Sequence, residues 1–282
     1  MEIKDKSSLP EFSVSLSVYQ NDNPGHFREA LNSIINQTVK PTEIVLVVDG
    51  PVPLEINVVV NEFESLFHPL KTICLPENKG HAIARQTGIE AANNELIALM
   101  DSDDISFPDR FEKQLSCFQK NPTLDVLGGQ MPEFINSTNN IVGIRNVPLD
   151  DFNIKHYLKT RCPFNQVTVM FKKSSVLKVG GYIDWHYEED YYLWIRMFEQ
   201  GCQFQNLTDN LVYVRVGNEM YKRRGGLKYF KSEAKLQAYM WQNKVISFPK
   251  YIFNVAVRLV VQVLLPNTLR GYIFQKLFRK SK

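Results

Sequence analysis

The chain has 282 residues, of which 44% are hydrophobic and 22% are charged, and its formal net charge is +3. This composition excludes a disordered protein and suits one large α/β domain, or a domain of about 200 residues with an appendage. The four cysteines lie far apart and form no Cys-x-x-Cys pair, so the sequence indicates neither a zinc site nor a disulfide framework. A reducing, cytoplasmic setting is expected, and the first residues contain no apolar run of the secretory type.

The first part of the chain alternates apolar, β-branched runs with amphipathic segments. The runs predict strands, and apolar residues at i, i+3, i+4 spacing predict the helices between them. Strands are expected at 12–18, 43–48, 70–75 and 95–100, and helices from residue 23, after residue 51, over 79–92 and after residue 104. This alternation predicts a mostly parallel sheet with helices on both faces.

The pattern is looser in the second part. Further strands are expected at 124–134, 141–147 and 165–172, and a helix that carries Leu193 and Met197 and stops at Gly201. In the tail, 227–247 predicts a helix, and 251–265 is strongly apolar.

Three carboxylates follow the strand at 95–100 within four residues: Asp101, Asp103 and Asp104. Like charges this close raise one another's pKa values unless a cation neutralises them. Their hard oxygen atoms suit Mg²⁺ or Mn²⁺, although a solvated turn that caps the next helix explains the triplet equally well when it is taken alone. Because parallel sheets bind ligands beyond the carboxyl ends of their strands, the metal interpretation is favoured.

Known nucleotide-binding loops are absent from the sequence. No Gly-x-Gly-x-x-Gly follows the first expected strand, and no Gly-x-x-x-x-Gly-Lys-Ser/Thr occurs. A nucleotide would therefore be held through its metal-bound diphosphate.

Four segments, taken in order, resemble the conserved blocks of family 2 glycosyltransferases with the GT-A fold. They are residues 14–19, 36–50, 78–92 and 99–108. The resemblance spans roughly residues 12–215. It implies a GT-A catalytic domain over 1–220, with a donor half at about 12–120 and an acceptor half at 121–220, followed by a basic amphipathic helical tail over 221–282.

The resemblance also implies the donor-site roles. Ser17 and Tyr19 would flank the uracil, Asp49 would bond the base edge, Arg85 would lie near the diphosphate, Asp101 would face the ribose and the metal, and Asp103 would be the principal metal ligand. Two alternatives stay open: Tyr19 as an aromatic cap of the sheet edge, and Arg85 as an ordinary surface ion pair.

A second acidic cluster contains Glu189 and Asp190, at the start of an expected helix. Acids there are also stabilised by the helix dipole. Followed by Leu193 and Trp194, the pair resembles the family block whose aspartate is the general base, which assigns that role to Asp190. The resemblance places Glu189, Asn165 and Trp194 on the acceptor side. No Gln-x-x-Arg-Trp follows Asp190, which favours a single-sugar transferase over a processive synthase.

The body of the chain and its C-terminal tail carry net charges of opposite sign. Residues 1–219 hold 19 basic and 29 acidic residues, whereas residues 220–282 hold 14 basic residues and one acid. The apolar segment at 251–265 is too short to span a bilayer. It either lies on an anionic membrane, as the basic and aromatic residues at 270–282 favour, or packs on the body as a helical domain.

The resemblance and the tail together predict an inverting, Mn²⁺- or Mg²⁺-dependent hexosyltransferase on the cytoplasmic face of the inner membrane. It would move Gal, Glc or an N-acetylhexosamine from a UDP-sugar to a lipid-diphosphate-linked oligosaccharide of O-antigen or capsule, forming a β-linkage, with no nucleic-acid partner. Two alternatives remain: a sugar nucleotidyltransferase, and a non-enzymatic membrane or nucleic-acid adaptor that acts through the basic tail.

Overall fold

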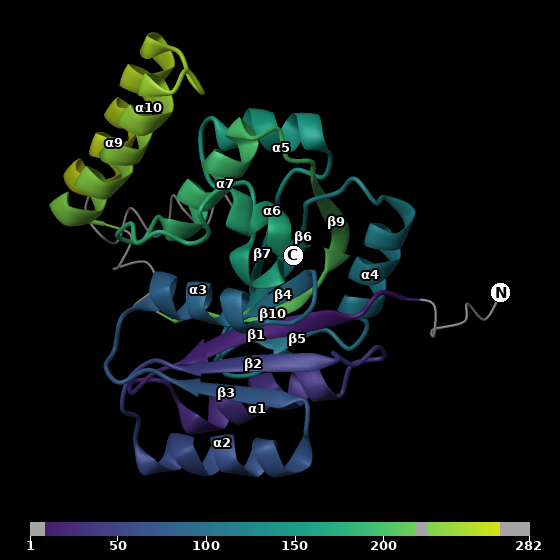
Figure 1. Cartoon of the computed structure of the whole chain (residues 1–282). Helices are drawn as coiled ribbons and strands as arrows, with labels where there is room; N and C mark the ends of the chain where they lie inside the picture. Colours follow the sequence, from purple (N-terminus) through teal and green to yellow (C-terminus); the bar gives the residue numbers. More distant parts are fainter. Residues whose placement is uncertain (1–8, 218–224, 266–282) are drawn as a thin grey trace.

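A computed structural model describes residues 9–217 and 225–265 of the chain. These residues form one ten-stranded sheet with the order β3-β2-β1-β4-β8-β6-β10-β5, with β7 and β9 also paired to β6 (Figure 1). The strands are β1 (Phe12–Val18), β2 (Glu43–Val48), β3 (Leu70–Cys74), β4 (Leu96–Met100), β5 (Ile105–Ser106), β6 (Val126–Phe134), β7 (Ile141–Arg145), β8 (Met170–Lys172), β9 (Phe204–Asn210) and β10 (Val212–Arg215). The predicted mostly parallel α/β sheet is confirmed.

Helices flank both faces of this sheet, and the last two described helices form a hairpin away from it (Figure 1). The helices are α1 (Pro24–Ile35), α2 (Leu54–Leu66), α3 (His81–Ala91), α4 (Arg110–Lys120), α5 (Asp151–Leu158), α6 (Lys173–Lys178), α7 (Glu189–Glu199), α9 (Leu227–Gln242) and α10 (Phe248–Leu259). Successive residues of a strand point to opposite faces. Leu46 of β2 therefore joins one core cluster with Phe27 of α1 and Phe63 of α2, while Val45 joins the other with Ile89 of α3.

The first four strands run parallel and in register, β3-β2-β1-β4, so their carboxyl ends share one edge. Each is joined to the next by a helix, and the start of the first helix shows why the prediction succeeded. Asn23 Oδ1 accepts hydrogen bonds from the N–H groups of Gly25 and His26, at 2.9 and 3.1 Å, and Pro24 occupies the first helical position. This is the cap that Asn-Pro predicts.

The strand predicted at 165–172 is shorter in the structure. Gln166–Thr168 forms a 3-10 helix, and only Met170–Lys172 pairs as β8, antiparallel to both β4 and β6. Asn165 itself is extended, and its side-chain amide donates to the carbonyl oxygens of Gly129, at 2.8 Å, and Arg145, at 3.0 Å. The backbone turns after it, where the N–H and the hydroxyl of Thr168 donate to the Asn165 carbonyl at 2.9 and 2.7 Å.

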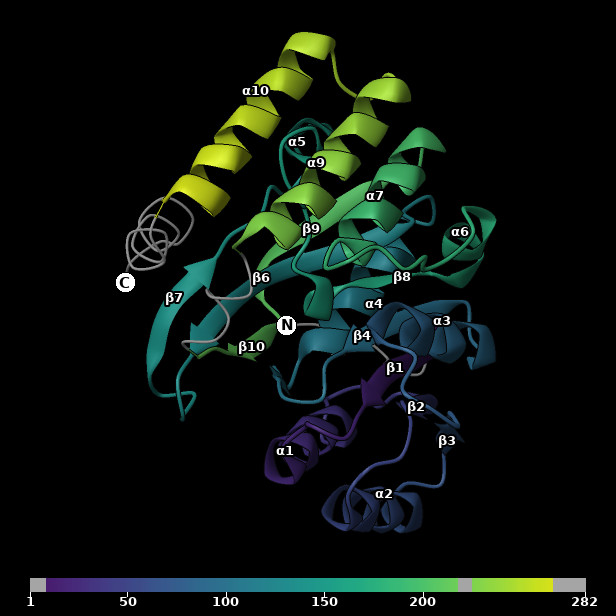
Figure 2. The same ribbon diagram turned by 90° about the vertical axis from the view of Figure 1, so that its left-hand side faces the viewer.

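The tail forms a helical hairpin, α9 and α10, which a π-helical turn extends over Val260–Leu264 (Figure 2). The hairpin packs on the body. Asn254 donates to the Lys159 carbonyl at 3.0 Å, Trp185 donates to the Ser232 carbonyl at 3.3 Å, and the Tyr239 hydroxyl donates to Glu199 at 2.9 Å. No helix in 9–217 or 225–265 combines the length and hydropathy needed to cross a membrane. The basic segment predicted at 270–282 lies outside the described residues.

Candidate active site

Three predicted donor-site residues lie at the carboxyl ends of β1 and β2. Ser17 is half-buried near the end of β1, Tyr19 is exposed just after it, and Asp49 is buried directly after β2. The Asp49 carboxylate accepts the backbone N–H groups of Lys79, at 2.7 Å, and Gly80, at 3.0 Å, so it holds the loop that begins α3. The structure thus gives Asp49 a local role. Its contact with a base, and those of Ser17 and Tyr19, stay predictions.

Gly50 allows this loop to come close. Its φ is +84°, and a Cβ there would lie 2.5 Å from the backbone nitrogen of Asn78. Glycine adopts positive φ without steric cost, so this position accepts no other residue without movement. The donor-side edge therefore depends on backbone fit as much as on side chains.

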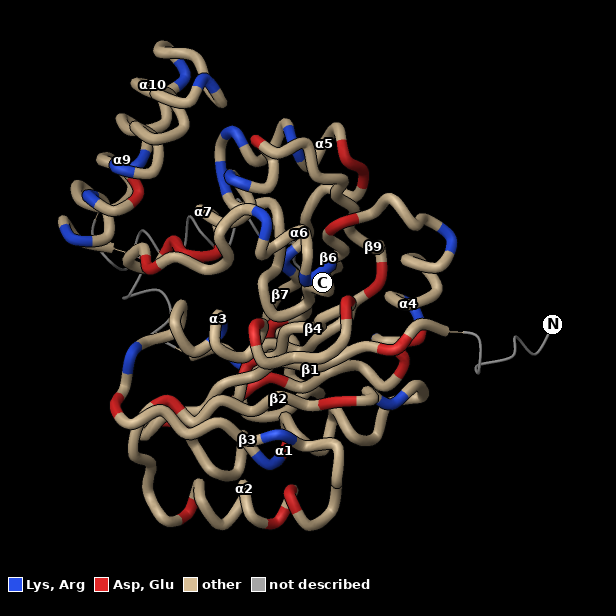
Figure 3. Tube along the Cα trace, viewed as in Figure 1, with Lys and Arg blue, Asp and Glu red and all other residues tan. Residues whose placement is uncertain are grey.

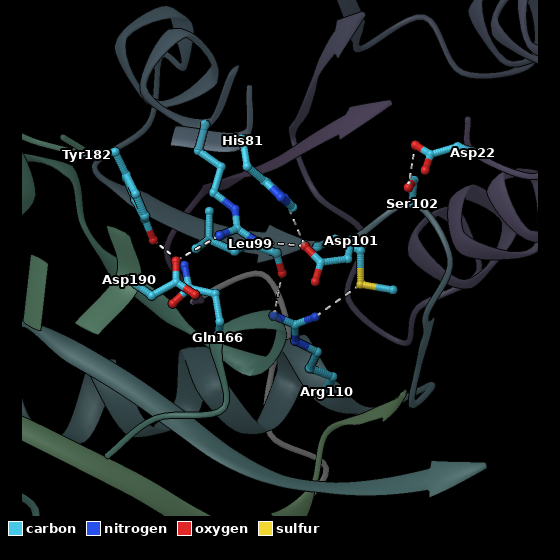
Figure 4. Close-up of polar contacts among 11 residues, drawn as sticks. Asp22, His81, Leu99, Asp101, Ser102, Arg110, Gln166, Tyr182 and Asp190 are labelled. Atoms are coloured by element: carbon cyan, nitrogen blue, oxygen red, sulfur yellow. Dashed lines mark hydrogen bonds and ion pairs between the residues drawn. The ribbon is translucent and has the colours of Figure 1, made fainter. Parts of the chain in front are cut away.

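One arginine joins the two carboxylate clusters. Arg85 of α3 donates from Nη2 to Asp101 Oδ1 and from Nη1 to Asp190 Oδ1, each at 2.8 Å. Arg85 is 6% exposed, so it is not the surface ion pair that the sequence left open. Asp101 follows β4 and Asp190 lies in the first turn of α7, which means that one guanidinium links the sheet edge to the second half of the chain (Figure 4).

The three aspartates after β4 have different surroundings. Asp104 is buried and accepts the backbone N–H of Arg215 at 2.8 Å, which ties β10 to the acidic turn. Burial, followed by Asp103 and Asp101, raises the pKa of Asp104 well above its ordinary value. Asp103 is exposed at the residue level, yet lost hydration of its carboxyl group, then Asp101 and Asp22, raise its pKa to about 6.

The acidic turn, Asp101 to Asp104, is the predicted metal site. No group of three or more His, Cys, Asp or Glu side chains among residues 9–217 and 225–265 is arranged to hold a metal ion. The chemistry of Asp101 and Asp103 nevertheless fits a divalent cation. The charge of Asp101 raises the pKa of Asp103, and a cation bound between the two carboxylates would relieve that repulsion.

Asp190 has the environment of a proton acceptor. Burial raises its pKa to about 7, with Glu189 and Asp101 acting in the same direction, while Arg85 opposes the shift. A base whose pKa lies near the operating pH transfers protons efficiently. Glu189, beside it on α7, is half-buried, and burial raises its pKa as well.

The other two predicted acceptor-side residues lie in the interior. Trp194 is fully buried, with its ring centroid 5.1 Å from that of Phe164, and Asn165 is fully buried with its amide bonded to backbone carbonyls. Neither borders the cavity described below. Their acceptor-side role stays a prediction. Trp194 packs against Phe164, which does border the cavity, so it supports the cavity wall from the interior.

Several site residues had no signal in the sequence. His81 Nε2 lies 4.0 Å from Asp101 Oδ1, and Arg85, then burial, lowers the pKa of His81 to about 4, so the ring is neutral near pH 7 (Figure 4). Tyr182 lies under Arg85, with the guanidinium 5.8 Å from its ring centroid, and is hydrogen-bonded to Gln166. Only the fold brings these residues together, since they come from separate elements.

A cavity of about 680 Å³ opens beside the two clusters. Asp101 and Asp190 border one part of it, and its far wall comes from the hairpin, through Glu233, Arg258 and Gln262. The tail therefore completes the cavity that contains the candidate base. A carboxylate at such a position can accept a proton from a bound hydroxyl group, and the carboxylate and amide oxygens of the far wall can accept hydrogen bonds from further hydroxyl groups.

Known proteins resemble the chain along nearly its whole length. The sequence model of Glycosyl transferase family 2 matches residues 13–181. An uncharacterized glycosyltransferase of Haemophilus influenzae is 41% identical, covering 96% of this chain and 100% of the relative. The Escherichia coli UDP-Gal:alpha-D-GlcNAc-diphosphoundecaprenol beta-1,3-galactosyltransferase is 36% identical, covering 96% of this chain and 98% of the relative.

A solved structure shares the fold. The crystal structure of S. aureus TarS 1–349 in complex with UDP-GlcNAc superimposes with a TM-score of 0.65 at 18% identity, covering 89% of this chain and 72% of TarS 1–349. This likeness agrees with the predicted GT-A architecture. Together with the family match and the full-length relatives, it leads to one conclusion: the chain is a glycosyltransferase that belongs to glycosyl transferase family 2.

Proposed function

We propose that this enzyme transfers a single hexose from a UDP-sugar to a sugar acceptor carried on a lipid diphosphate, in the synthesis of a surface polysaccharide such as O-antigen or capsule. The observation that carries the proposal is the Arg85 bridge, which holds a candidate base and a donor-side carboxylate on one cavity. The name of the 36% identical relative, a UDP-Gal:alpha-D-GlcNAc-diphosphoundecaprenol beta-1,3-galactosyltransferase, supports both substrate classes, and galactose is the first donor to test.

In this proposal Asp190 accepts the proton of the acceptor hydroxyl as the oxygen attacks the anomeric carbon. Its carboxylate is held by Arg85, so the acceptor side and the donor side keep a fixed relation during the reaction. Attack from the face opposite the departing diphosphate inverts the anomeric centre, and an α-linked donor gives a β-linked product. Asp103 and Asp101 would hold Mn²⁺ or Mg²⁺, which neutralises charge on the departing diphosphate.

The hairpin is proposed to rest on the cytoplasmic leaflet of the membrane. Phe253, Val257, Val260 and Leu264 are 60%, 44%, 47% and 65% exposed, at spacings of four, three and four residues. They form an apolar stripe along α10 and its π-helical extension. The charged residues of 225–265 are six Lys and Arg and the single Glu233, which suits anionic headgroups (Figure 3). Val257 also borders the cavity, so a lipid-linked acceptor would reach Asp190 directly from the bilayer.

The reaction is tested with a panel of donors: UDP-Gal, UDP-Glc, UDP-GalNAc, UDP-GlcNAc and, as a control, GDP-Man, in the presence of a lipid-diphosphate sugar acceptor. We expect UDP release and a β-linked product from one UDP-sugar with Mn²⁺, and loss of both with EDTA. Turnover that persists in EDTA would show that transfer does not depend on a divalent cation. Pyrophosphate release from UTP and a sugar phosphate, without glycosyl transfer, would contradict the reaction class.

The membrane contact is tested by co-sedimentation with vesicles that contain anionic or only zwitterionic lipid. Phe253→Glu with Leu264→Glu should release the protein from anionic vesicles, because it places two charges on the apolar stripe. Leu54→Glu on α2 is the matched control, since Leu54 is 74% exposed but lies outside the hairpin. Equal sedimentation of both variants would overturn the assignment of this surface.

A further inference from the structure

A polar cluster lies where the hairpin meets the cavity. Arg258 Nε lies 3.1 Å from Glu233 Oε2, and the Gln262 amide donates to the same oxygen. Arg258 also donates to the Thr160 carbonyl at 2.7 Å, which anchors the cluster to the body. Glu188, directly before the acidic pair of α7, borders the same cavity and is 6% exposed. The cluster thus ties α10 to α9 and to the body, and it shares the cavity with the segment that carries Asp190.

The cluster contains hydrogen-bonding capacity that the protein does not use. Gln262 is 5% exposed, and its Oε1 atom has no hydrogen-bond partner among the described residues. Leaving a buried carbonyl without a donor is unfavourable, and native proteins usually satisfy such groups. Because Gln262 borders the cavity, a ligand that donates a hydroxyl group would complete the bonding.

The charges of this wall select the kind of ligand. Glu233 pairs with the guanidinium of Arg258, and burial, followed by Glu233, raises the pKa of Glu188 well above its ordinary value. Because Arg258 is already paired with Glu233, the cluster offers a diphosphate little net positive charge, whereas sugar hydroxyls donate readily to carboxyl and amide oxygens. Tyr187 and Tyr229 also border the cavity, with ring centroids 6.1 Å apart, and Tyr187 is exposed. Aromatic rings offer an apolar face for the C–H side of a sugar ring.

We infer that a subsite for the sugar of the acceptor is formed by Glu188, Glu233, Arg258 and Gln262. The hairpin would then select the acceptor as well as contact the membrane. This inference rests on the proposed function, because it assigns the acceptor end of the same cavity. In it, Glu233 is a binding residue fixed by Arg258, and the acceptor diphosphate lies outside the cluster. The C-terminal helices are then part of the substrate site.

The decisive variant is Glu233→Gln, which keeps the side-chain shape and removes the charge. Its matched control is Glu199→Gln, because Glu199 also contacts the hairpin, through Tyr239, but does not border the cavity. The probes are octyl glycosides of Gal, Glc, GalNAc and GlcNAc, which carry no diphosphate, with binding measured by calorimetry and saturation-transfer NMR. Binding of UDP with Mn²⁺ is measured on the same samples.

We expect the wild type to bind one glycoside and Glu233→Gln to weaken that binding by about 10- to 100-fold, the loss typical of a hydrogen bond to a charged group. UDP binding and the Glu199→Gln control should stay within about twofold of wild type. If Glu233→Gln does not fold, Gln262→Met, which removes the unpartnered oxygen at similar volume, carries the same expectation.

Unchanged glycoside binding in the folded variant would overturn the subsite. So would a wild type that binds none of the glycosides, or a defect seen only with diphosphate-bearing acceptors, which would place the diphosphate at the cluster. Failure of the proposed function looks different: the wild type would bind a glycoside in a Glu233-dependent way and yet transfer no sugar to it from any donor.

Discussion

The proposed donor side and the proposed acceptor side of the enzyme are held together in different ways. On the donor side, consecutive parallel strands bring their ends to one edge, and backbone bonds such as those from Lys79 and Gly80 to Asp49 complete it. On the acceptor side, Asp190 depends on Arg85, and the far wall comes from helices of the tail. The donor side is thus a product of local chain order, whereas the acceptor side is assembled from distant segments. This difference suggests that acceptor choice can change without disturbing donor binding.

Removing the link between the sides should have the largest effect. Arg85→Leu would leave Asp101 and Asp190 without their shared cation, which should lower kcat about 10³-fold and the free energy of unfolding by about 3–5 kcal/mol. Steady-state kinetics and urea unfolding measure the two effects. Arg28→Leu is the control, because the Arg28–Glu62 pair is exposed and should matter little. Equal behaviour of the two variants would show that the sides are independent.

The next effect should be confined to the donor side. Asp103→Asn should reduce UDP affinity in Mn²⁺ to the value measured in EDTA and lower kcat/KM by roughly 10²- to 10³-fold, because a neutral amide is a weak ligand for a hard cation. Calorimetry with UDP measures this. Asp109→Asn, at an exposed ion pair with Lys113, should leave UDP binding unchanged. Metal-dependent binding that survives Asp103→Asn would reject the ligand assignment.

Much of the donor side could be predicted from the sequence. Apolar runs and caps predict β1, β2 and β4 because their residues follow a local period. Asp101 and Asp103 follow the β4 run directly in the sequence, and the resemblance then implied their roles. The link from Arg85 to Asp190 joins residues 105 positions apart and leaves no local pattern. The hairpin wall was missed for the same reason: charge and hydropathy predicted the helices but not what Glu233 and Arg258 face.

The acceptor side should show a pH dependence of its own. Burial raises the pKa of Asp190 to about 7, so kcat should fall about tenfold per unit below that pH as the base becomes protonated. Between pH 3.8, the ordinary pKa of an aspartate, and about pH 7, Asp190 holds a proton in the folded state but not in the unfolded state. The free energy of unfolding therefore falls as pH rises through this window. Rate and stability should therefore change in opposite directions.

Other groups contribute to the stability profile, so a comparison is needed. The pKa of His81, lowered to about 4, gives a slope of opposite sign between about 4 and its ordinary 6.5. Subtracting the unfolding profile of Asp190→Asn from that of wild type isolates the Asp190 contribution. A wild-type kcat that stays flat from about pH 5 to 8 would be incompatible with a base of this pKa.

The smallest effect concerns the backbone fit of the donor edge. Gly50→Ala would strain a φ of +84° and place Cβ 2.5 Å from Asn78 N, so we expect a loss of about 1–3 kcal/mol in the free energy of unfolding. UDP affinity should also weaken, because Asp49 holds the same loop. Gly201→Ala shares a positive φ, +76°, but meets nothing within 4 Å. If urea unfolding gives both variants the same loss of free energy, the close approach of Gly50 to Asn78 does not contribute to stability.

The Asp190→Asn variant tests whether Asp190 acts on the acceptor while the donor is bound elsewhere. We would measure UDP binding by calorimetry and single-turnover transfer on the same preparation. We expect UDP affinity within about twofold of wild type and a transfer rate lower by roughly 10²- to 10⁴-fold. Transfer at the wild-type rate, or loss of UDP binding together with transfer, would contradict this expectation.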